Sequence, residues 1–99
     1  MIADYIFNID VNNDYSILNF KNKLYTGIYH VIIKGDLINA YYIISKFNIL
    51  DNDPFINRLH YHSNVNIDIH WGMNEQIKIR TINNILNFSY RIEVKLYEL

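Results

Sequence analysis

Hydrophobic and polar residues alternate along the last third of the chain, between positions 65 and 99. Turn-prone residues, Gly72-Met73-Asn74 and Asn83-Asn84, divide this stretch into three runs. The apolar positions are Val65, Ile67, Ile69 and Trp71, then Ile77, Ile79 and Thr81, and finally Leu86, Phe88, Tyr90, Ile92, Val94 and Leu96. Because strand side chains point alternately to two faces, each run predicts a strand with one apolar face. We expect three consecutive antiparallel strands, with the long last one at or near the centre of the sheet.

Three strands are expected before this block. Residues 3–11 alternate, with Tyr5, Phe7, Ile9 and Val11 on one face. Residues 27–34 are apolar on both faces apart from His30, a pattern typical of a strand in mid-sheet or covered on two sides. Residues 58–62 read as a short strand after the loop Asp51-Asn52-Asp53-Pro54, the strongest loop signal in the chain.

Two helices are predicted between these strands. Asp14 is a candidate N-cap for a short helix over 14–23, although the apolar stripe there is only partial. Gly35-Asp36 precedes a second helix over 36–48. Leu37, Ala40, Tyr41, Ile44 and Phe47 fall at helical spacing in that stretch.

The order strand, helix, strand, helix and four strands predicts an α+β fold for residues 1–99 as a single domain. The expected architecture is a two-layer sandwich. A mostly antiparallel sheet of five to six strands carries one or two helices on one face, and its other face is partly solvated or covered by a partner. Phe88 and Ile92 are expected in the core, where truncation to alanine would cost roughly 2–5 kcal/mol.

Composition narrows the function classes. The net charge is −1 and the charged share is 19%, without a run of Lys or Arg, so neither the basic surface of a nucleic-acid binder nor the acidic surface of a DNA mimic is present. No apolar run is long enough to span a membrane, and no signal peptide is evident. Cysteine is absent, which removes disulfides and thiolate sites. We expect a cytoplasmic protein without a cofactor.

Three histidines form one candidate site. His60 and His62 share a face of their strand, and His70 lies on the polar face of the next, near Asp68. If these strands form a hairpin, the imidazoles converge and resemble a zinc ligand set. The competing interpretation is a set of ordinary polar-face residues, because no catalytic motif accompanies them.

Aromatic and charged residues on the expected solvent faces form the other candidate site. Tyr and Arg are enriched among residues that carry binding energy at protein interfaces. Tyr41 and Tyr42 are adjacent, so at least one points away from the core, and Tyr61 and Tyr97 are out of phase with the apolar sets of their strands. The predicted partner-binding residues are Tyr41, Tyr42, Tyr61, Asp68, His70, Arg80, Arg91, Glu93 and Tyr97.

The sequence favours a non-catalytic protein-binding module, a small inhibitor such as a toxin-immunity protein or a phage or plasmid protein that blocks a host defence enzyme. The alternative is a small metal-binding protein or hydrolase that uses His60, His62 and His70. A homo-oligomer that pairs sheet faces or edges is compatible with either hypothesis.

Overall fold

Eight strands account for the regular secondary structure of this computed structural model, which describes residues 2–18 and 25–99. The strands are β1 (Tyr5–Val11), β2 (Ser16–Ile17), β3 (Gly27–Gly35), β4 (Ile38–Lys46), β5 (Phe55–Ser63), β6 (Asn66–His70), β7 (Lys78–Ile82) and β8 (Tyr90–Glu98). They form two antiparallel sheets, and no helix occurs in these two ranges.

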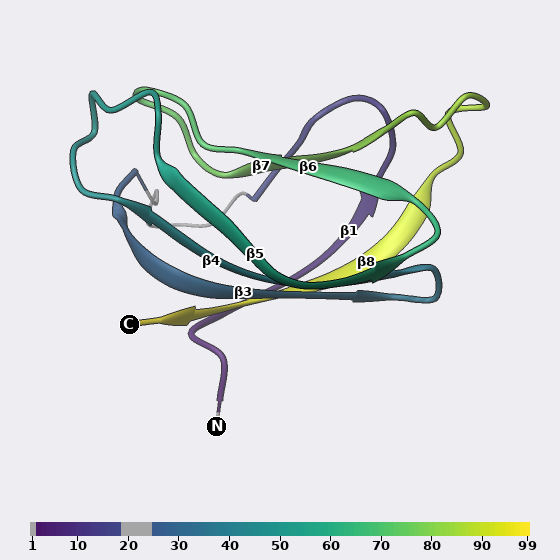
Figure 1. The fold of residues 1–99 in the computed structure, drawn as a ribbon, viewed down its shortest axis with the longest axis horizontal. Helices are drawn as coiled ribbons and strands as arrows, with labels where there is room; N and C mark the ends of the chain where they lie inside the picture. Colours follow the sequence, from purple (N-terminus) through teal and green to yellow (C-terminus); the bar gives the residue numbers. More distant parts are fainter. Residues whose placement is uncertain (1, 19–24) are drawn as a thin grey trace.

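The sheets lie face to face as a sandwich (Figure 1). One sheet has five strands in the order β1-β8-β3-β4-β5, and the other has three in the order β2-β7-β6. The prediction for residues 27–34 is confirmed, because β3 is the central strand of the larger sheet. β8 is an interior strand beside it.

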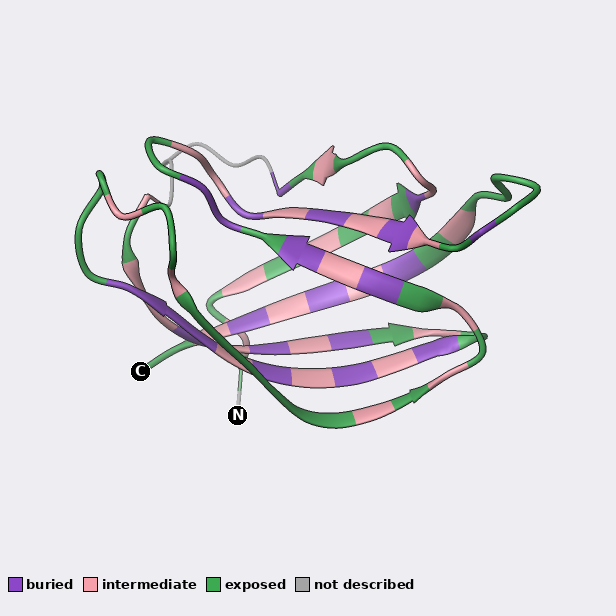
Figure 2. Cartoon of the chain, turned by 45° about the horizontal axis from the view of Figure 1, so that its top comes forward, coloured by how far each residue is buried: buried purple, intermediate pink, exposed green. Residues whose placement is uncertain are grey.

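The core lies between the two sheets. Alternate residues of each strand are buried there, which Figure 2 shows as bands along the strands. The five-stranded sheet contributes Tyr29, Val31, Ile33, Ile92, Val94 and Leu96, and the three-stranded sheet contributes Ile67, Ile69, Ile77 and Ile79, together with Trp71. The inward set expected for 65–81 is therefore confirmed, and a second sheet covers the larger one in place of helices.

The predicted α+β class is wrong because the fold is all-β. Within residues 36–48, expected as a helix, Ile38–Lys46 form β4, where Ile38, Ala40 and Ile44 are buried. Leu37 and Phe47, which flank this strand, are 43% and 77% exposed. The apolar residues of this stretch fit the two-residue repeat of a strand as well as helical spacing, and its Ile and Tyr residues favour strands. Asp36–Leu37 is a hairpin turn that brings β4 against β3 with Lys34 opposite Asn39.

The first predicted helix is also wrong where the structure describes it. Ser16 and Ile17 form β2, and Ser16 pairs with Ile79 of β7. Leu18 continues this contact, since its N–H donates to the carbonyl of Ile77 at 2.9 Å. Positions 19–23 of that prediction lie outside the described residues.

The C-terminal strands do not form one meander. β6 and β7 pair as predicted, with Asp68 opposite Arg80, but β8 lies in the other sheet between β1 and β3. Leu86 and Phe88, expected in the core, are 71% and 56% exposed in the crossover loop.

Asparagines build that crossover loop. The side chain of Asn84 accepts from the N–H of Phe88 at 3.2 Å and donates to the Phe88 carbonyl at 2.8 Å. Asn83 and Asn87 adopt left-handed φ angles of 57° and 49°, which Asn tolerates better than most residues. The alternation of apolar and polar residues thus continues through a segment that forms a loop and not a paired strand.

A buried lysine links the two sheets at one end. Lys46, at the end of β4, is fully buried and donates to the carbonyl of Gly72 after β6. Its Nζ also lies 5.4 Å from the centre of the Trp71 ring. Burial lowers the pKa of Lys46, because removal from water disfavours the charged form.

Candidate interaction surfaces

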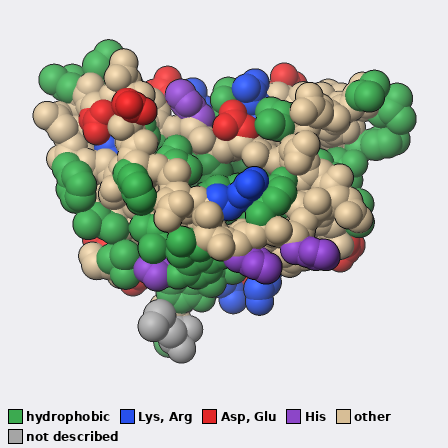
Figure 3. Space-filling model, viewed as in Figure 1, with side chains coloured by type: hydrophobic (Ala, Val, Ile, Leu, Met, Phe, Trp, Pro, Cys, Tyr) green, Lys and Arg blue, Asp and Glu red, His purple; other side chains and the backbone are tan. Residues whose placement is uncertain are grey.

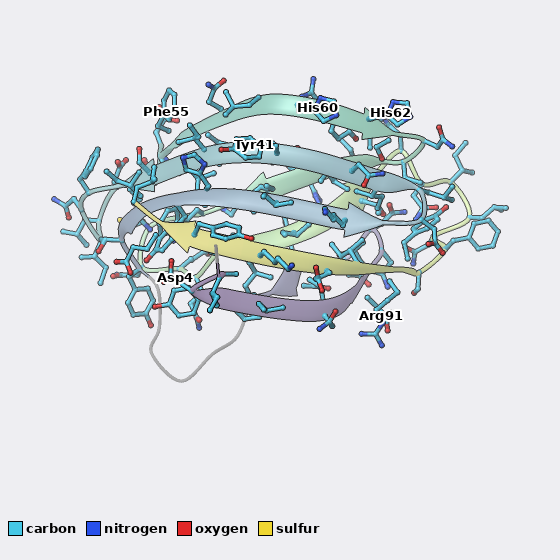
Figure 4. All side chains as sticks on the ribbon, turned by 90° about the horizontal axis from the view of Figure 1, so that it is seen from below. Asp4, Tyr41, Phe55, His60, His62 and Arg91 are labelled. Carbon is cyan, nitrogen blue, oxygen red and sulfur yellow. The ribbon has the colours of Figure 1, made fainter. Side chains whose placement is uncertain are left out.

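The five-stranded sheet presents its second face to solvent, and we call this the broad face (Figure 4). Because alternate residues of each strand fill the core, those between them project outward. The outward residues are Ile6 and Asn8 of β1; Ile28, His30, Ile32 and Lys34 of β3; Asn39, Tyr41 and Ile43 of β4; Asn57, His60 and His62 of β5; and Arg91, Glu93, Lys95 and Tyr97 of β8. β5 forms one border of the face and β1 the other.

Tyr41 stands at the centre of the broad face between two shallow grooves. A groove of about 440 Å³ is lined by His30, Ile32, Tyr41, Tyr97, Glu98 and Leu99. Another of about 370 Å³ shares Ile32 and Tyr41 and extends to His60 and His62. In Figure 3, hydrophobic side chains gather at the lower edge, where this sheet lies, with histidines among them. The centre of the face is therefore apolar and hollowed.

Tyr41 is held in place by His30 on the neighbouring strand. The Tyr41 hydroxyl hydrogen-bonds with Nδ1 of His30. The two rings meet edge to face, with centroids 5.3 Å apart and planes at 89°. This pairing is an arrangement that aromatic rings favour, and it orients the tyrosine ring before any partner arrives.

Ion pairs border the apolar centre toward β1. Arg91 Nε lies 3.1 Å from Asp10 Oδ1, and Lys95 Nζ lies 3.5 Å from Glu93 Oε1. Such exposed pairs contribute little to stability. They leave both signs of charge at the rim, where they can guide association with a partner.

The outer side of the three-stranded sheet, which we call the narrow face, carries a polar network around Tyr15. The Tyr15 hydroxyl donates to Asp68 Oδ2 at 2.9 Å, and Arg80 Nε donates to the same oxygen at 3.3 Å. The Arg80 guanidinium lies 4.4 Å from the centre of the Tyr15 ring. Burial raises the pKa of Tyr15, and its hydrogen bond to Asp68 raises it further.

Glu75 extends this network. Its Oε2 lies 3.1 Å from Lys78 Nζ and 3.4 Å from His70 Nε2. The hydrogen bond from Lys78 lowers the pKa of Glu75. The His70 ring lies 5.8 Å from that of Tyr15. Every cation of this network therefore has an acidic or aromatic neighbour, and the narrow face has no concentrated charge of one sign.

Removing the Asp68 carboxylate should cost about 1 kcal/mol of folding free energy, since two partly exposed hydrogen bonds are lost. The measurement is urea denaturation of Asp68→Ala at low and high salt, with the exposed loop residue Asp53 changed to alanine as the matched control. Equal effects of the two substitutions would show that the Tyr15 network does not stabilise the fold.

The nine predicted partner-binding residues are divided among three environments. Tyr41, Tyr97, Arg91 and Glu93 lie on the broad face, whereas Asp68, His70 and Arg80 lie on the narrow face at the opposite side of the sandwich. Tyr42 is a core residue, only 5% exposed. Tyr61 is half-buried, and its hydroxyl donates to the Val65 carbonyl at 2.9 Å and accepts from the Ile67 N–H at 3.1 Å. The nine residues do not form one surface.

Sequence reasoning missed the apolar centre of the broad face. His30 and Ile32 of β3 and Ile43 of β4, which lie next to Tyr41, were absent from the predicted set, and so was Ile28 farther along β3. The sequence did contain an indication of this surface, because residues 27–34 are apolar on both faces. Only one of those faces is needed for the core, so the other is left as apolar surface.

The three candidate histidines do not converge. His60 and His62 lie on the broad face, and His70 lies on the narrow face. The hairpin that would bring the three imidazoles together is not formed, since β5 pairs with β4 and β6 pairs with β7. Over residues 2–18 and 25–99, no three His, Cys, Asp or Glu side chains are grouped so as to hold a metal ion.

Comparisons with known proteins found no matching family model and no significant similarity to a curated protein or a solved structure. The described strands and loops include no helix with the length and apolar character needed to cross a membrane.

Proposed function

We propose that this chain is a protein-binding module and that its partner covers the centre of the broad face. The observation that carries this proposal is the outward side of β3 and β4. Ile32, Ile43 and Tyr41 lie there, partly exposed, although the inner sides of the same strands already fill the core. Contiguous apolar surface on a sheet face is typical of an interaction site.

The arrangement of the face supports a protein as the partner. Tyr41 and Tyr97 offer large rings at low entropic cost, and Tyr is among the residues that carry most of the binding energy at interfaces. Asn, His and paired charges surround them. A tyrosine-centred apolar patch inside a polar rim has the usual composition of such an interface.

The proposed role is inhibition of the bound protein, as an immunity protein inhibits a toxin or an anti-defence protein inhibits a host enzyme. The rigid sheet supports this role, because a preorganised surface loses little entropy on binding and can block a partner's site by covering it. The small size and balanced charge of the chain favour the same class.

Tyr41→Ala should weaken partner binding by about 2 kcal/mol, roughly thirty-fold, because a centrally placed aromatic side chain is removed. The partner is first captured from the native host with wild-type protein and identified by mass spectrometry, and its affinity is then measured by calorimetry. Tyr15→Ala on the narrow face is the matched control and should retain binding.

Melting temperatures of both variants separate binding from folding. If Tyr15→Ala abolishes binding while Tyr41→Ala keeps it, the partner occupies the narrow face. Weak binding by Tyr41→Ala together with loss of its fold would also count against the broad face.

A further inference from the structure

We infer that a second copy of this chain adds to the free edge of β5, giving a two-fold symmetric dimer with a continuous antiparallel sheet. The inference goes beyond the proposed partner, because it concerns the border strand of the broad face and not its centre. β5 is nine residues long, and among the described strands it pairs only with β4. Along its other side, no described backbone or side-chain group hydrogen-bonds to its main chain.

The other borders of the sandwich are better closed. Beyond β1 the chain turns directly into the smaller sheet, where the N–H of Thr81 donates to the carbonyl of Asn12 at 2.7 Å. At the border of the smaller sheet, the Tyr61 hydroxyl binds the Val65 carbonyl and the Ile67 N–H as β6 begins. β5 has neither protection, so its unpaired amides form a template for another strand.

The side chains of β5 also favour pairing. Phe55, Ile56 and Leu59 are 57%, 36% and 50% exposed, so apolar surface follows the open edge. Soluble proteins commonly protect such edges with several charges. β5 has one, Arg58, whose guanidinium lies 4.3 Å from the centre of the Tyr61 ring instead of extending from the edge.

A second copy fits this edge in a definite register. A bulge at Leu59 shifts the pairing with β4, since Arg58 lies opposite Tyr42 and His60 opposite Tyr41. Regular pairing is therefore available to residues 55–58. Residues that lie directly opposite each other in a continuous antiparallel sheet point to the same face. The two-fold axis must therefore pass between one residue and the same residue of the second copy, and not between two neighbouring positions of the strand.

An axis at Ile56 or at Asn57 meets these conditions. We place it at Asn57 because only that register brings the apolar Phe55 and Leu59 together. Asn57 lies opposite Ile43 and hence on the broad-face side. With the axis at Asn57, its amide faces the same amide of the second copy. Ile56 lies opposite Arg58 of the second copy, so the aliphatic stem of Arg58 covers Ile56 and the two guanidinium groups do not oppose each other. Phe55 lies beside Leu59 of the second copy, where both lose exposed apolar area.

The predicted contact is short, and a short strand pairing buries less than a standard protein interface. The dimer should therefore dissociate on dilution. Analytical ultracentrifugation of the purified chain over a wide concentration range should show a mass that rises from 11.9 kDa toward twice that value.

Substitutions at Asn57 test the symmetry directly. Asn57→Lys and Asn57→Glu each place like charges opposite each other, so each should raise the dimer dissociation constant at least tenfold. Mixing the two variants in equal amounts should restore a dimer, because only the mixed pair has opposite charges at the axis. Asn8→Lys on β1 is the matched control, an exposed asparagine at the other border, and should dimerise as wild type.

Melting temperatures confirm that the variants are folded. A chain that is monomeric at every concentration overturns the inference. So does a dimer that Asn57→Lys leaves intact, or one that Asn8→Lys disrupts. Failure of the mixed variants to associate would also overturn it, and would leave a strand from another protein as the occupant of this edge. None of these results depends on partner binding by Tyr41.

Discussion

Replacing Ile92 with alanine should lower the free energy of unfolding by about 2–5 kcal/mol, whereas Phe88→Ala should lower it by less than about 1 kcal/mol. Ile92 is 1% exposed on the inner side of β8. It lies opposite Ile9 of β1 and Gly35 of β3, so truncation opens a cavity between three strands. Urea denaturation measures both values, with the same dependence of the unfolding free energy on urea concentration used for the two variants.

Phe88 has an environment that explains the difference. Its ring is 56% exposed in the crossover loop, and the hydrogen bonds that hold this loop run from Asn84 to the main chain of Phe88. Alanine preserves those bonds. A loss at Phe88→Ala as large as that at Ile92→Ala would show that the loop packs into the core and that β8 begins earlier than the structure has it.

Raising the pH from 10 to 12 should destabilise the fold, because burial raises the pKa of Tyr29 and of Tyr42 from 10.0 to about 12. In the unfolded chain these phenols lose their protons near pH 10, whereas the folded chain retains them. The stabilisation is fully present below pH 10 and is lost as the pH rises through 12. A shift of two units corresponds to at most about 3 kcal/mol for each tyrosine.

The test is the unfolding free energy as a function of pH for wild type and Tyr42→Phe. The variant lacks one of the two titrating groups, so its stability should decline less steeply over this window. Tyr97→Phe, on the outer face of β8, is the matched control and should follow the wild-type curve more closely. Identical slopes for wild type and Tyr42→Phe would mean that the Tyr42 hydroxyl is hydrated in the folded chain.

Part of the candidate surface could be predicted from the sequence. One of Tyr41 and Tyr42 had to face outward in either a helix or a strand, and the phase of Tyr97 in the last run indicated its outward side. The choice between Tyr41 and Tyr42 depended on the register of β4 against β3, which local periodicity does not contain. The separation of His70 from His60 depended on which sheet each strand joined.

The sequence by itself determined the strands whose alternation is unambiguous. Residues 3–11, 65–71 and 77–81 carry one apolar face each, and the doubly apolar 27–34 indicated a strand in mid-sheet or one covered on two sides. These features are local, because the alternation of side chains follows from backbone geometry alone.

Tertiary structure decided the rest. Residues 36–48 fit both a helical and a strand period, and pairing with β3 on one side and β5 on the other selected the strand. The alternation over 86–96 did not reveal that its first residues form a loop, because that depends on the crossing of β8 to the other sheet. Pairing between distant strands is a long-range interaction, so which strands share a sheet, and which faces and edges are left open, depends on the whole chain.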